Sequence, residues 1–362
     1  MDWTGALNLV RVSRYANAGV NINDVAKIHS LLARKFTKSF DHRRRRFGQV
    51  VGGIGHYAGL IDIGGDRLLA IHVDGVGTKV LVAQMVDKGY ESIGVDCVAM
   101  CANDLICLGS EPLCLVDYIA LKHADEALVD QLAKGLLRGA EEARMAVVGG
   151  ETAIVPDMIR GVGRNGFDIA ATGLGLVNRD RVIDGSKLNE GDAIVGVTSS
   201  GVHSNGLSLA RKSLFSKFAA DDTIDGFDRS LGEELLVPTR IYVKPVLEII
   251  RRYEVNGLAH ITGGAFSKLT RIGRKARKGF KLDRMPRSQP IFQLIQKTSR
   301  VNKKEMYRTF NMGIGFCVCA PKNDAENIIE LFEKNKMKSQ IVGTVIKNPG
   351  VYLGSLRLDN GT

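Results

Sequence analysis

Short apolar runs typical of strands alternate with helix-type runs along this chain, and the alternation occurs twice. A polar stretch, 178–189, separates the two series. A chain with this pattern folds as α/β or α+β domains, in which helices cover sheets. Its 362 residues are also about twice the size of a typical domain. We therefore predict two domains, residues 1–178 and 179–362.

Each predicted element is recognised by its hydrophobic period and by the turn residues around it. In the first domain we expect strands at 68–73, 113–119, 146–148 and 167–177 and helices at 94–108 and 124–143. In the second we expect strands at 193–198, 258–261, 313–319 and 340–346 and helices from about 205, at 238–252 and at 265–273.

A further helix is predicted at 20–40, ahead of a basic linker and the glycine-rich segment 51–59. Asn23 is its expected N-cap. The apolar residues at helical spacing are Val25, Ile28, Leu31, Leu32 and Phe36.

Composition excludes several classes of protein. With 44% hydrophobic and 25% charged residues, the chain is neither disordered nor a coiled coil. No apolar run approaches the roughly 18 residues that a bilayer span requires. The first ten residues lack the basic head and apolar stretch of a secretory signal. We expect a cytoplasmic protein without a membrane partner.

The six cysteines, at 97, 101, 107, 114, 317 and 319, lie in apolar runs. They do not form paired C-x-x-C spacings, so the sequence suggests neither a zinc site nor a disulfide framework. We predict reduced cysteines that pack in the core.

The net charge of +11 is unevenly distributed. Residues 181–362 carry 30 basic against 18 acidic side chains, whereas 51–180 carry 10 against 18. The basic segments 43–46 and 271–287 contain almost no aromatic residues, which a dedicated single-strand nucleic-acid surface would use for stacking. We interpret these segments as solvated surface and predict no nucleic-acid partner. The acidic first half suits a cation site.

The segment Leu68-Leu-Ala-Ile-His-Val-Asp-Gly-Val-Gly-Thr-Lys79 resembles an anion-binding turn. Its apolar strand ends at Asp74, its glycines allow backbone N–H groups to approach an anion, and Lys79 supplies a positive charge for phosphate. The alternative is a tight turn with a surface lysine. The chain has no P-loop motif, and Gly161–Gly166, which matches G-x-G-x-x-G, precedes a strand, so we predict a hairpin loop there.

The helix predicted at 94–108 presents oxygen-bearing side chains beside an apolar face. Asp96 and Asn103 fall within about 20° of each other and Asp104 about 80° away. Solvated polar residues are the alternative, but we favour Mg2+ ligation. Asp117 within a strand and Glu151 after a strand add carboxylates. Asp74, Asp104 and Glu151 could gather Mg2+ ions around a triphosphate.

A second anion-binding loop is predicted at Ser199-Ser-Gly-Val-His-Ser-Asn-Gly206, between a strand and a helix. His203 lies within it and is either catalytic or structural. Thr262-Gly-Gly-Ala265 repeats the strand-to-helix arrangement.

These segments, in this order, resemble the aminoimidazole ribonucleotide synthetase family, also called phosphoribosylformylglycinamidine cyclo-ligases. The similarity spans residues 15 to about 346, and its last three motifs are more specific to this enzyme than to its superfamily. The matching stretches are Tyr15-x-x-Ala-Gly-Val20, Asp74-Gly-Val-Gly-Thr-Lys79, Val98-Ala-Met-Cys-Ala-Asn-Asp-Leu105, Gly149-Gly-Glu-Thr-Ala153, Ser199–Gly206, Pro238-Thr-Arg-Ile-Tyr-Val-Lys244, His260-Ile-Thr-Gly-Gly264 and Glu305-Met-Tyr-Arg-Thr-Phe-Asn311.

The resemblance implies a homodimer whose N-terminal mixed sheets form a shared barrel, with ATP near the subunit interface and a C-terminal α/β sandwich domain. It implies that ATP phosphorylates the formyl amide oxygen of formylglycinamidine ribonucleotide, after which the imidazole ring closes. Carried over residue by residue, it implies catalytic roles for His203 and Asp104 and Mg2+ ligation by Asp74, Asp104 and Glu151. The implied ATP contacts are Gly75, Gly77, Thr78, Lys79, Gly149, Gly150, Thr152 and Asn205.

Some features leave alternatives open. The family's N-terminal site lysine has no clear counterpart here, and Lys27, Lys35 and Lys38 are the alternatives. The basic segments 41–46 and 274–304 depart from the family pattern. Related ATP-dependent enzymes, such as formylglycinamidine ribonucleotide synthetase, selenophosphate synthetase and thiamine-phosphate kinase, are the nearest rival functions. Selenophosphate synthetase would require a reactive cysteine near the glycine-rich loop, and no cysteine precedes residue 97. A basic nucleic-acid-binding protein is the rival from another class.

Overall fold

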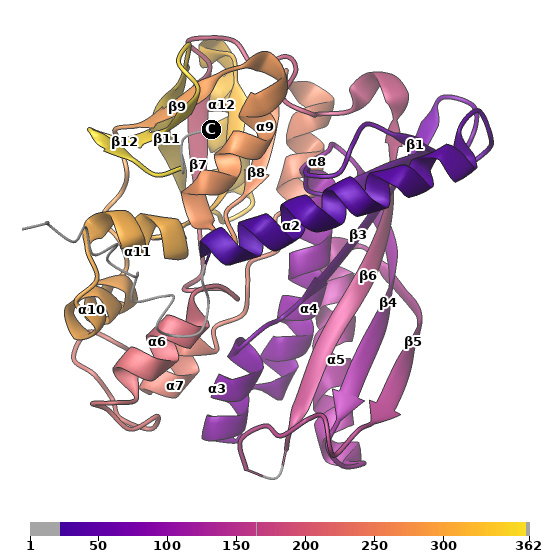
Figure 1. The fold of residues 1–362 in the computed structure, drawn as a ribbon. Coiled ribbons are helices and arrows are strands. Elements are labelled where there is room, and N and C mark those ends of the chain that lie inside the picture. The colour runs from indigo at the N-terminus through magenta and orange to yellow at the C-terminus, as the bar shows by residue number, and fades with distance from the viewer. Residues whose placement is uncertain (1–21, 164, 360–362) are drawn as a thin grey trace, which may run out of the picture.

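The computed structural model describes residues 22–163 and 165–359, which form two sheets. The six-stranded sheet has the order β1-β2-β3-β6-β4-β5, and the seven-stranded sheet has the order β13-β12-β9-β11-β7-β10-β8. Figure 1 shows them side by side, the first in purple to pink and the second mostly in orange to yellow. The predicted Tyr15–Val20 motif lies outside the described residues.

The first sheet contains every strand predicted for residues 1–178, each longer than predicted at one or both ends, and two more, β1 and β2. Its strands are β1 (Gln49–Val51), β2 (Gly59–Asp62), β3 (Arg67–Gly75), β4 (Glu111–Leu121), β5 (Ala146–Ile154) and β6 (Phe167–Asn178). The helices of this region are α2 (Ile22–Phe36), the 3-10 turn η1 (Thr37–Arg43), α3 (Lys79–Val86), α4 (Tyr90–Ile106) and α5 (Glu126–Ala143).

Two local predictions in this region are wrong. Asn23 lies inside α2 and does not precede the helix, so it is not an N-cap. Residues 161–166 connect β5 to β6, but β4 lies between these two strands in the sheet, so the connection is not a hairpin.

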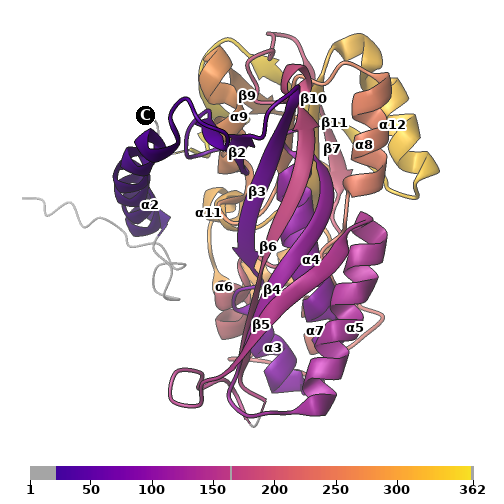
Figure 2. The same cartoon turned by 90° about the vertical axis from the view of Figure 1, so that its right-hand side faces the viewer.

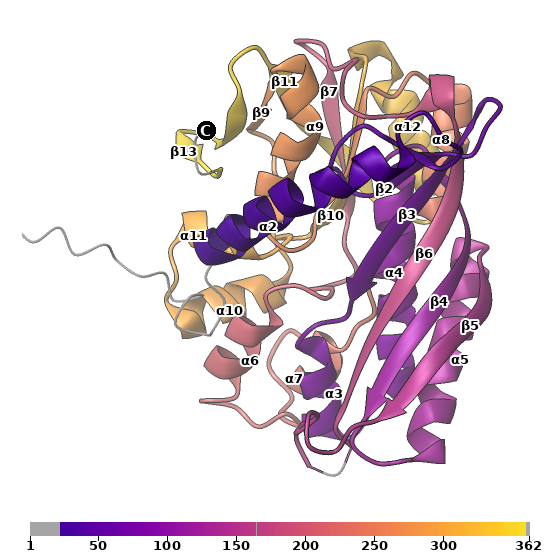
Figure 3. The ribbon, with the colours of Figure 1, turned by 45° about the vertical axis from the view of Figure 1, so that its right-hand side comes forward.

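In the part of the chain that the structure describes, helices cover one face of the first sheet and leave the other uncovered. Along β6, residues 167, 169, 171, 173 and 175 alternate with their neighbours and point toward α4, where Gly173 meets Leu105 and Cys101. Figures 2 and 3 show α4 and α5 behind the strands. The opposite face exposes apolar side chains at Val73, Leu113, Val116, Tyr118 and Val148.

Helix α4 is buried on nearly all sides. Gly94 on α4 and Gly135 on α5 let the two backbones come into contact, because a Cβ at Gly135 would lie 1.9 Å from the Glu91 carbonyl oxygen. The predicted polar face of α4 is not solvated, since Asp96, Asn103 and Asp104 are all buried. Each of them needs a partner to offset its lost hydration.

The second sheet contains the four strands predicted for residues 179–362 and three more. Its strands are β7 (Ala193–Thr198), β8 (Gly257–His260), β9 (Gly279–Leu282), β10 (Ile314–Ala320), β11 (Ser339–Ile346), β12 (Gly350–Leu353) and β13 (Leu356–Arg357). The segments around it form short 3-10 turns, η2 (Arg179–Arg181), η3 (Ala265–Lys268) and η4 (Lys322–Asp324), and the helices α6 (Leu207–Leu214), α7 (Leu231–Leu235), α8 (Val243–Arg252), α9 (Leu269–Ala276), α10 (Pro290–Ser299), α11 (Lys303–Thr309) and α12 (Ala325–Lys334).

Helices lie on both sides of this second sheet. Figure 2 shows α9 on one side and α8 and α12 on the other. The helix predicted at 238–252 begins only at Val243, because residues 238–242 form an irregular segment that packs against α4.

Buried polar contacts join α4 to segment 238–242. Lys79 Nζ lies 2.7 Å from Asp96 Oδ2, with both side chains fully buried, and it donates to the Val237 carbonyl. The Thr239 N–H donates to Asp96 Oδ1 at 2.7 Å. Asn103 donates to the Arg240 carbonyl and accepts from the Tyr242 N–H. Two polar side chains of α4 therefore hold the segment that enters α8.

All six cysteines are unpaired, five of them buried and Cys114 partly exposed, as predicted for core residues. Among the described residues, no helix combines the length and apolar character needed to cross a lipid bilayer.

We expect Asp96→Asn to destabilise the protein strongly, because it leaves the Lys79 ammonium buried without a counter-charge. Breaking a buried ion pair in this way lowers the free energy of unfolding by about 3–5 kcal/mol. Urea unfolding of the variant measures the effect. The matched control is Asp130→Asn, which removes one member of the exposed Lys134–Asp130 pair and should change stability little. Equal effects of the two substitutions would contradict the assignment.

Candidate active site

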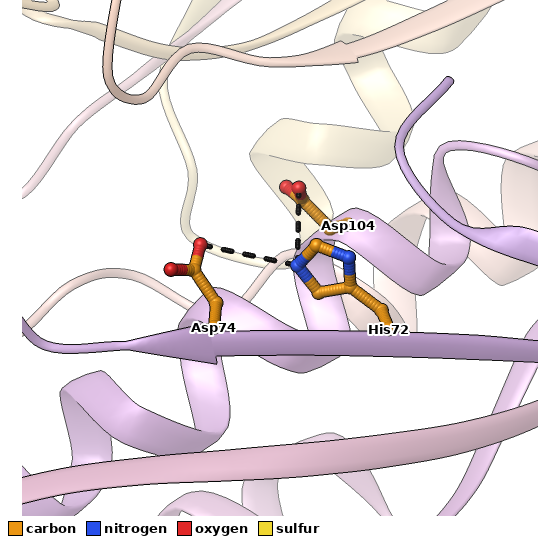
Figure 4. A group of neighbouring side chains, drawn as sticks. All are labelled: His72, Asp74 and Asp104. Atoms are coloured by element: carbon orange, nitrogen blue, oxygen red, sulfur yellow. Dashed lines mark ion pairs between the residues drawn. The ribbon is translucent and has the colours of Figure 1, made fainter. Parts of the chain in front are cut away.

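His72 and Asp74 lie two residues apart on β3, so both point to the face that α4 covers. Asp104 on α4 meets them there, as Figure 4 shows. His72 Nε2 lies 3.4 Å from Asp104 Oδ2 and 3.9 Å from Asp74 Oδ2. One ligand atom from each residue lies within 4.8 Å of the other two. The structure thus brings together Asp74 and Asp104, two of the three predicted metal ligands.

A histidine from the second sheet holds Asp104 in place. His260, at the end of β8, lies with Nδ1 2.8 Å from Asp104 Oδ1, and its Nε2 lies 3.4 Å from Asn103 Nδ2. Burial lowers the pKa of His260, although Asp104 opposes this shift, so the ring is neutral and Nδ1–H donates to the carboxylate. The site therefore combines residues from both sheets.

Positive charges beside Asp104 keep it ionised. Burial alone would raise the pKa of Asp104, but the charge of Lys268 and the hydrogen bond from His260 outweigh burial and lower it well below its usual range. Lys268 donates to Thr262 Oγ1. The ammonium group of Lys268 and the guanidinium group of Arg271 both lie over the ring of buried Tyr57. These cations balance the carboxylates and could also attract phosphate.

Lys79 does not present a charge to a phosphate. Its side chain is fully buried and paired with Asp96. Burial lowers its pKa, and Asp96 opposes the shift. The prediction of a phosphate contact is therefore wrong, because the lysine on the turn points into the protein. For the same reason Asp96 and Asn103, engaged with segment 238–242, are not metal ligands.

Glu151 lies outside the cluster of His72, Asp74 and Asp104. In the sheet Asp74 is in register with Ala171, Ala171 with Asp117, and Asp117 with Gly150, so three strand spacings, about 14 Å, separate β3 from β5. Glu151 is the next residue and points to the opposite, exposed face. The prediction that it joins Asp74 and Asp104 is wrong within one chain.

The other residues predicted on β5 share its position at the sheet edge. Gly149, Gly150 and Thr152 are exposed, and none lies beside Asp74 within this chain. Asp117, beside Gly150, has a pKa raised by burial. These positions follow from the strand order, which places β5 at the edge of the sheet and cannot be read from the sequence motif.

The loop 199–206 holds His203 in a buried position. His203 is buried at 1% exposure and adopts a left-handed backbone conformation with φ of +62°. Its Nε2 accepts from the Ser200 N–H at 3.1 Å, whereas Nδ1 has no partner among the described residues. Burial lowers the pKa of His203 well below its usual value, so the ring is neutral.

Two predicted anion-binding segments do lie together. A Cβ at Gly263 would lie 3.0 Å from Asn205 Oδ1, so loop 199–206 borders the turn Thr262–Ala265. Asn205 Nδ2 has no partner among the described residues. Thr78 Oγ1, at the end of the β3 turn, lies 3.0 Å from Ser208 Oγ on α6. The turn after β3 and loop 199–206 therefore face a common region.

Sequence reasoning missed His72, Lys268 and Arg271 and gave His260 no role. His72 was detectable, because the period of two along a strand places it on the same face as Asp74. Lys268 and Arg271 carried no such signal. Lys268 lies within the predicted helix 265–273, and Arg271 begins the basic segment interpreted as solvated surface.

Comparison with known proteins places the chain. Residues 55–177 match the family model "AIR synthase related protein, N-terminal domain", and residues 189–354 match "AIR synthase related protein, C-terminal domain". The chain belongs to the AIR synthase family. The two matched regions of the chain contain the site residues His72, Asp74, Asp104, His260 and Lys268.

Curated members of the AIR synthase family are similar along almost the whole chain. A phosphoribosylformylglycinamidine cyclo-ligase from Pyrococcus furiosus is 47% identical over 94% of this chain and 97% of its own. One from Methanocaldococcus jannaschii is 45% identical over 92% of each chain.

Solved structures share the two-sheet α/β fold at much lower identity. Thiamine-monophosphate kinase from Stenotrophomonas maltophilia aligns with a TM-score of 0.60 and 18% identity, covering 88% of this chain and 95% of its own. A chain of the HypE–HypF complex aligns with a TM-score of 0.62 and 17% identity, covering 90% and 95%.

We expect His56, in the glycine-rich segment beside Tyr57, to make stability depend on pH. Burial lowers its pKa from about 6.5 to about 4, so the unfolded chain binds a proton at higher pH than the folded one. The free energy of unfolding should therefore fall as the pH drops from about 6.5 to about 4, by on the order of 3 kcal/mol from this group.

The measurement is urea unfolding between pH 7 and pH 4.5. His56→Gln should flatten the pH dependence, whereas His123→Gln, at an exposed loop position, should keep the parent profile. An unchanged slope in His56→Gln would contradict this prediction.

Proposed function

We propose that this protein catalyses the ATP-dependent cyclisation of formylglycinamidine ribonucleotide to 5-aminoimidazole ribonucleotide, with release of ADP and phosphate. The observation that carries the proposal is 45–47% identity, over at least 92% of the chain, to relatives named phosphoribosylformylglycinamidine cyclo-ligase. The protein would act in purine biosynthesis in the cytoplasm.

The chemistry requires an amide oxygen to leave, which is difficult until that oxygen is phosphorylated. ATP transfers its γ-phosphoryl group to the formyl amide oxygen, and the amidine nitrogen then attacks the activated carbon. Ring closure expels phosphate and a proton. Phosphoryl transfer depends mainly on positioning and charge neutralisation, so the protein needs fixed charges more than a nucleophile of its own.

Solved proteins of the same fold support ATP as the phosphoryl donor. One is AaThiL, complexed with AMPPCP and TMP, and another is PurL from T. maritima, complexed with ADP. We propose that the turn after β3 contacts the nucleotide phosphates through Gly75, Gly77 and Thr78. Gly77 has φ of +67°, a conformation that glycine adopts readily. Asn205, with its free amide N–H, is a second proposed contact.

The donor set of the site fits a divalent cation. Asp74 and Asp104 supply carboxylate oxygens, and His260 fixes one oxygen of Asp104. Mg2+ bound there would neutralise charge on the phosphates. In this arrangement Asp104 stays ionised, and Lys268 takes the phosphate-facing role that the sequence suggested for Lys79.

His203 is proposed as a hydrogen-bond donor near the transferred phosphoryl group. Its Nε2 accepts from the Ser200 backbone, so the proton of the neutral ring lies on Nδ1, which has no partner among the described residues. An imidazole in this state stabilises negative charge by donation and does not accept a proton at Nε2. This geometry favours charge stabilisation over general-base catalysis.

We propose a homodimer joined through the uncovered face of the first sheet. Val73, Thr172 and Val116 form one row across that face, and Val73 is 65% exposed. Exposed apolar side chains over several strands favour association. A second copy packed face to face would close the half-barrel, with residues 1–178 as the ATP-binding and dimerisation domain and 179–362 as the substrate domain.

The direct test measures ADP release by the purified protein with ATP and Mg2+. We expect release to depend on formylglycinamidine ribonucleotide and to match the formation of aminoimidazole ribonucleotide. The corresponding amide substrate is the control, because its ribosyl-bearing nitrogen belongs to an amide, which is a much weaker nucleophile than an amidine, and it should give no aminoimidazole product. ADP release that is the same with and without substrate would refute the proposed function.

Asp104→Asn should lower kcat/KM by on the order of 10²-fold or more, because it removes a charge from the proposed metal and phosphate site. Steady-state kinetics measure the effect. Asp157→Asn, at an exposed loop position, is the matched control and should behave like the parent. A decrease within about twofold would show that Asp104 is only structural.

His203→Ala should lower kcat by about 10²- to 10⁴-fold if the imidazole acts on the transferred group. The vacated space also lowers the melting temperature whatever the role. The decisive measurement is therefore kcat well below the melting temperature. A variant that keeps its kcat but melts earlier would assign His203 to the fold alone.

A further inference from the structure

His72 occupies an unusual position for a histidine in a sheet. Its Nε2 is buried and has no hydrogen-bond partner among the described residues. The two nearest charged atoms are carboxylate oxygens, Asp104 Oδ2 at 3.4 Å and Asp74 Oδ2 at 3.9 Å. Figure 4 shows the ring nitrogen between the two carboxylates.

The two carboxylates are arranged in the same way. Asp74 Oδ1 accepts from the Gly75 N–H at 2.8 Å, and Asp104 Oδ1 accepts from His260. In each residue Oδ1 is thus held by the protein, while Oδ2 faces His72. Ligand carboxylates in metal sites are commonly fixed through their second oxygen in this manner.

Three potential ligand atoms, one nitrogen and two oxygens, therefore converge, and no hydrogen bond joins them among the described residues. Such a set is stabilised when a cation lies among the three atoms. The alternative is an ion pair between His72 and the two aspartates.

We propose that His72, Asp74 and Asp104 form a mixed nitrogen and oxygen site that selects Mn2+ over Mg2+. Mg2+ prefers oxygen ligands, demands near-ideal octahedral geometry and loses its water reluctantly. Mn2+ also takes carboxylate ligands, but as a first-row transition ion it accepts a nitrogen ligand more readily than Mg2+ does. The role of this ion rests on the proposed function, because the ion would lie beside the ATP phosphates. His72 is the specificity-determining residue.

Metal binding can be tested without turnover, on the full-length protein freed of metal. Titration with Mn2+, followed by the electron paramagnetic resonance signal of the free ion, gives its affinity, and calorimetry gives that of Mg2+. We expect Mn2+ to bind at least tenfold more tightly than Mg2+. Pulsed electron paramagnetic resonance of the Mn2+ complex should show coupling to an imidazole nitrogen.

His72→Gln keeps a polar side chain of similar length and removes the ring nitrogen. It should weaken Mn2+ binding about tenfold or more, remove the nitrogen coupling and change Mg2+ binding by less than about threefold. His123→Gln removes an exposed histidine and should leave both affinities unchanged.

The proposal would be overturned if the two ions bound with equal affinity. It would also be overturned if the Mn2+ complex of the parent protein showed no coupling to an imidazole nitrogen. Absence of Mn2+ binding would also overturn it and leave the ion pair as the role of His72. The parent measurements need no variant, so a folding defect in His72→Gln cannot obscure the result. A protein that binds Mn2+ through His72 but releases no ADP with substrate would refute the proposed function alone.

Discussion

The position of α4 against segment 238–242 determines the geometry of the whole site. Asp96 and Asn103 bind backbone groups of that segment, and Lys79 neutralises Asp96 where water cannot reach. These contacts connect the helix that carries Asp104 to the second sheet, which carries His260. The sequence suggested phosphate or metal binding for Lys79, Asp96 and Asn103. In the structure they instead stabilise the contact that positions the site.

The regular elements could largely be predicted from the sequence, because strands and helices differ in hydrophobic period. β7 was predicted with its observed ends, and the four predicted strands of the first sheet differ from the prediction mainly in length, whereas β1 and β2 were not predicted. The prediction of a helix over 238–242 was wrong, because backbone groups of that segment bind Asp96 and Asn103 and the helix begins only at Val243. The cluster of Asp74 and Asp104 was also predicted, since a strand end and a polar helix face both pointed to it.

The remaining site residues depended on information that spacing does not contain. Glu151 resembled Asp74, because both were expected at a strand end beside glycines. In the structure Glu151 lies inside β5, so strand order places it at the far edge of the sheet and register turns its side chain to the opposite face. Lys79 was assigned by residue type, and its burial against Asp96 reversed its expected exposure. The cation beside Asp104 is instead Lys268, a residue of the predicted helix 265–273 to which the sequence gave no role.

The backbone contact between α4 and α5 also affects when this region meets solvent. Gly94 and Gly135 leave no space for water between the helices, and α4 is covered by the first sheet on another side. Amide hydrogens of such a helix exchange with deuterium only when the surrounding structure opens as a unit. Asp104 therefore lies on an element whose exchange reports global opening, whereas exposed α2 reports local fluctuation. Hydrogen exchange would thus distinguish opening of α4, which carries Asp104, from local fluctuation of α2.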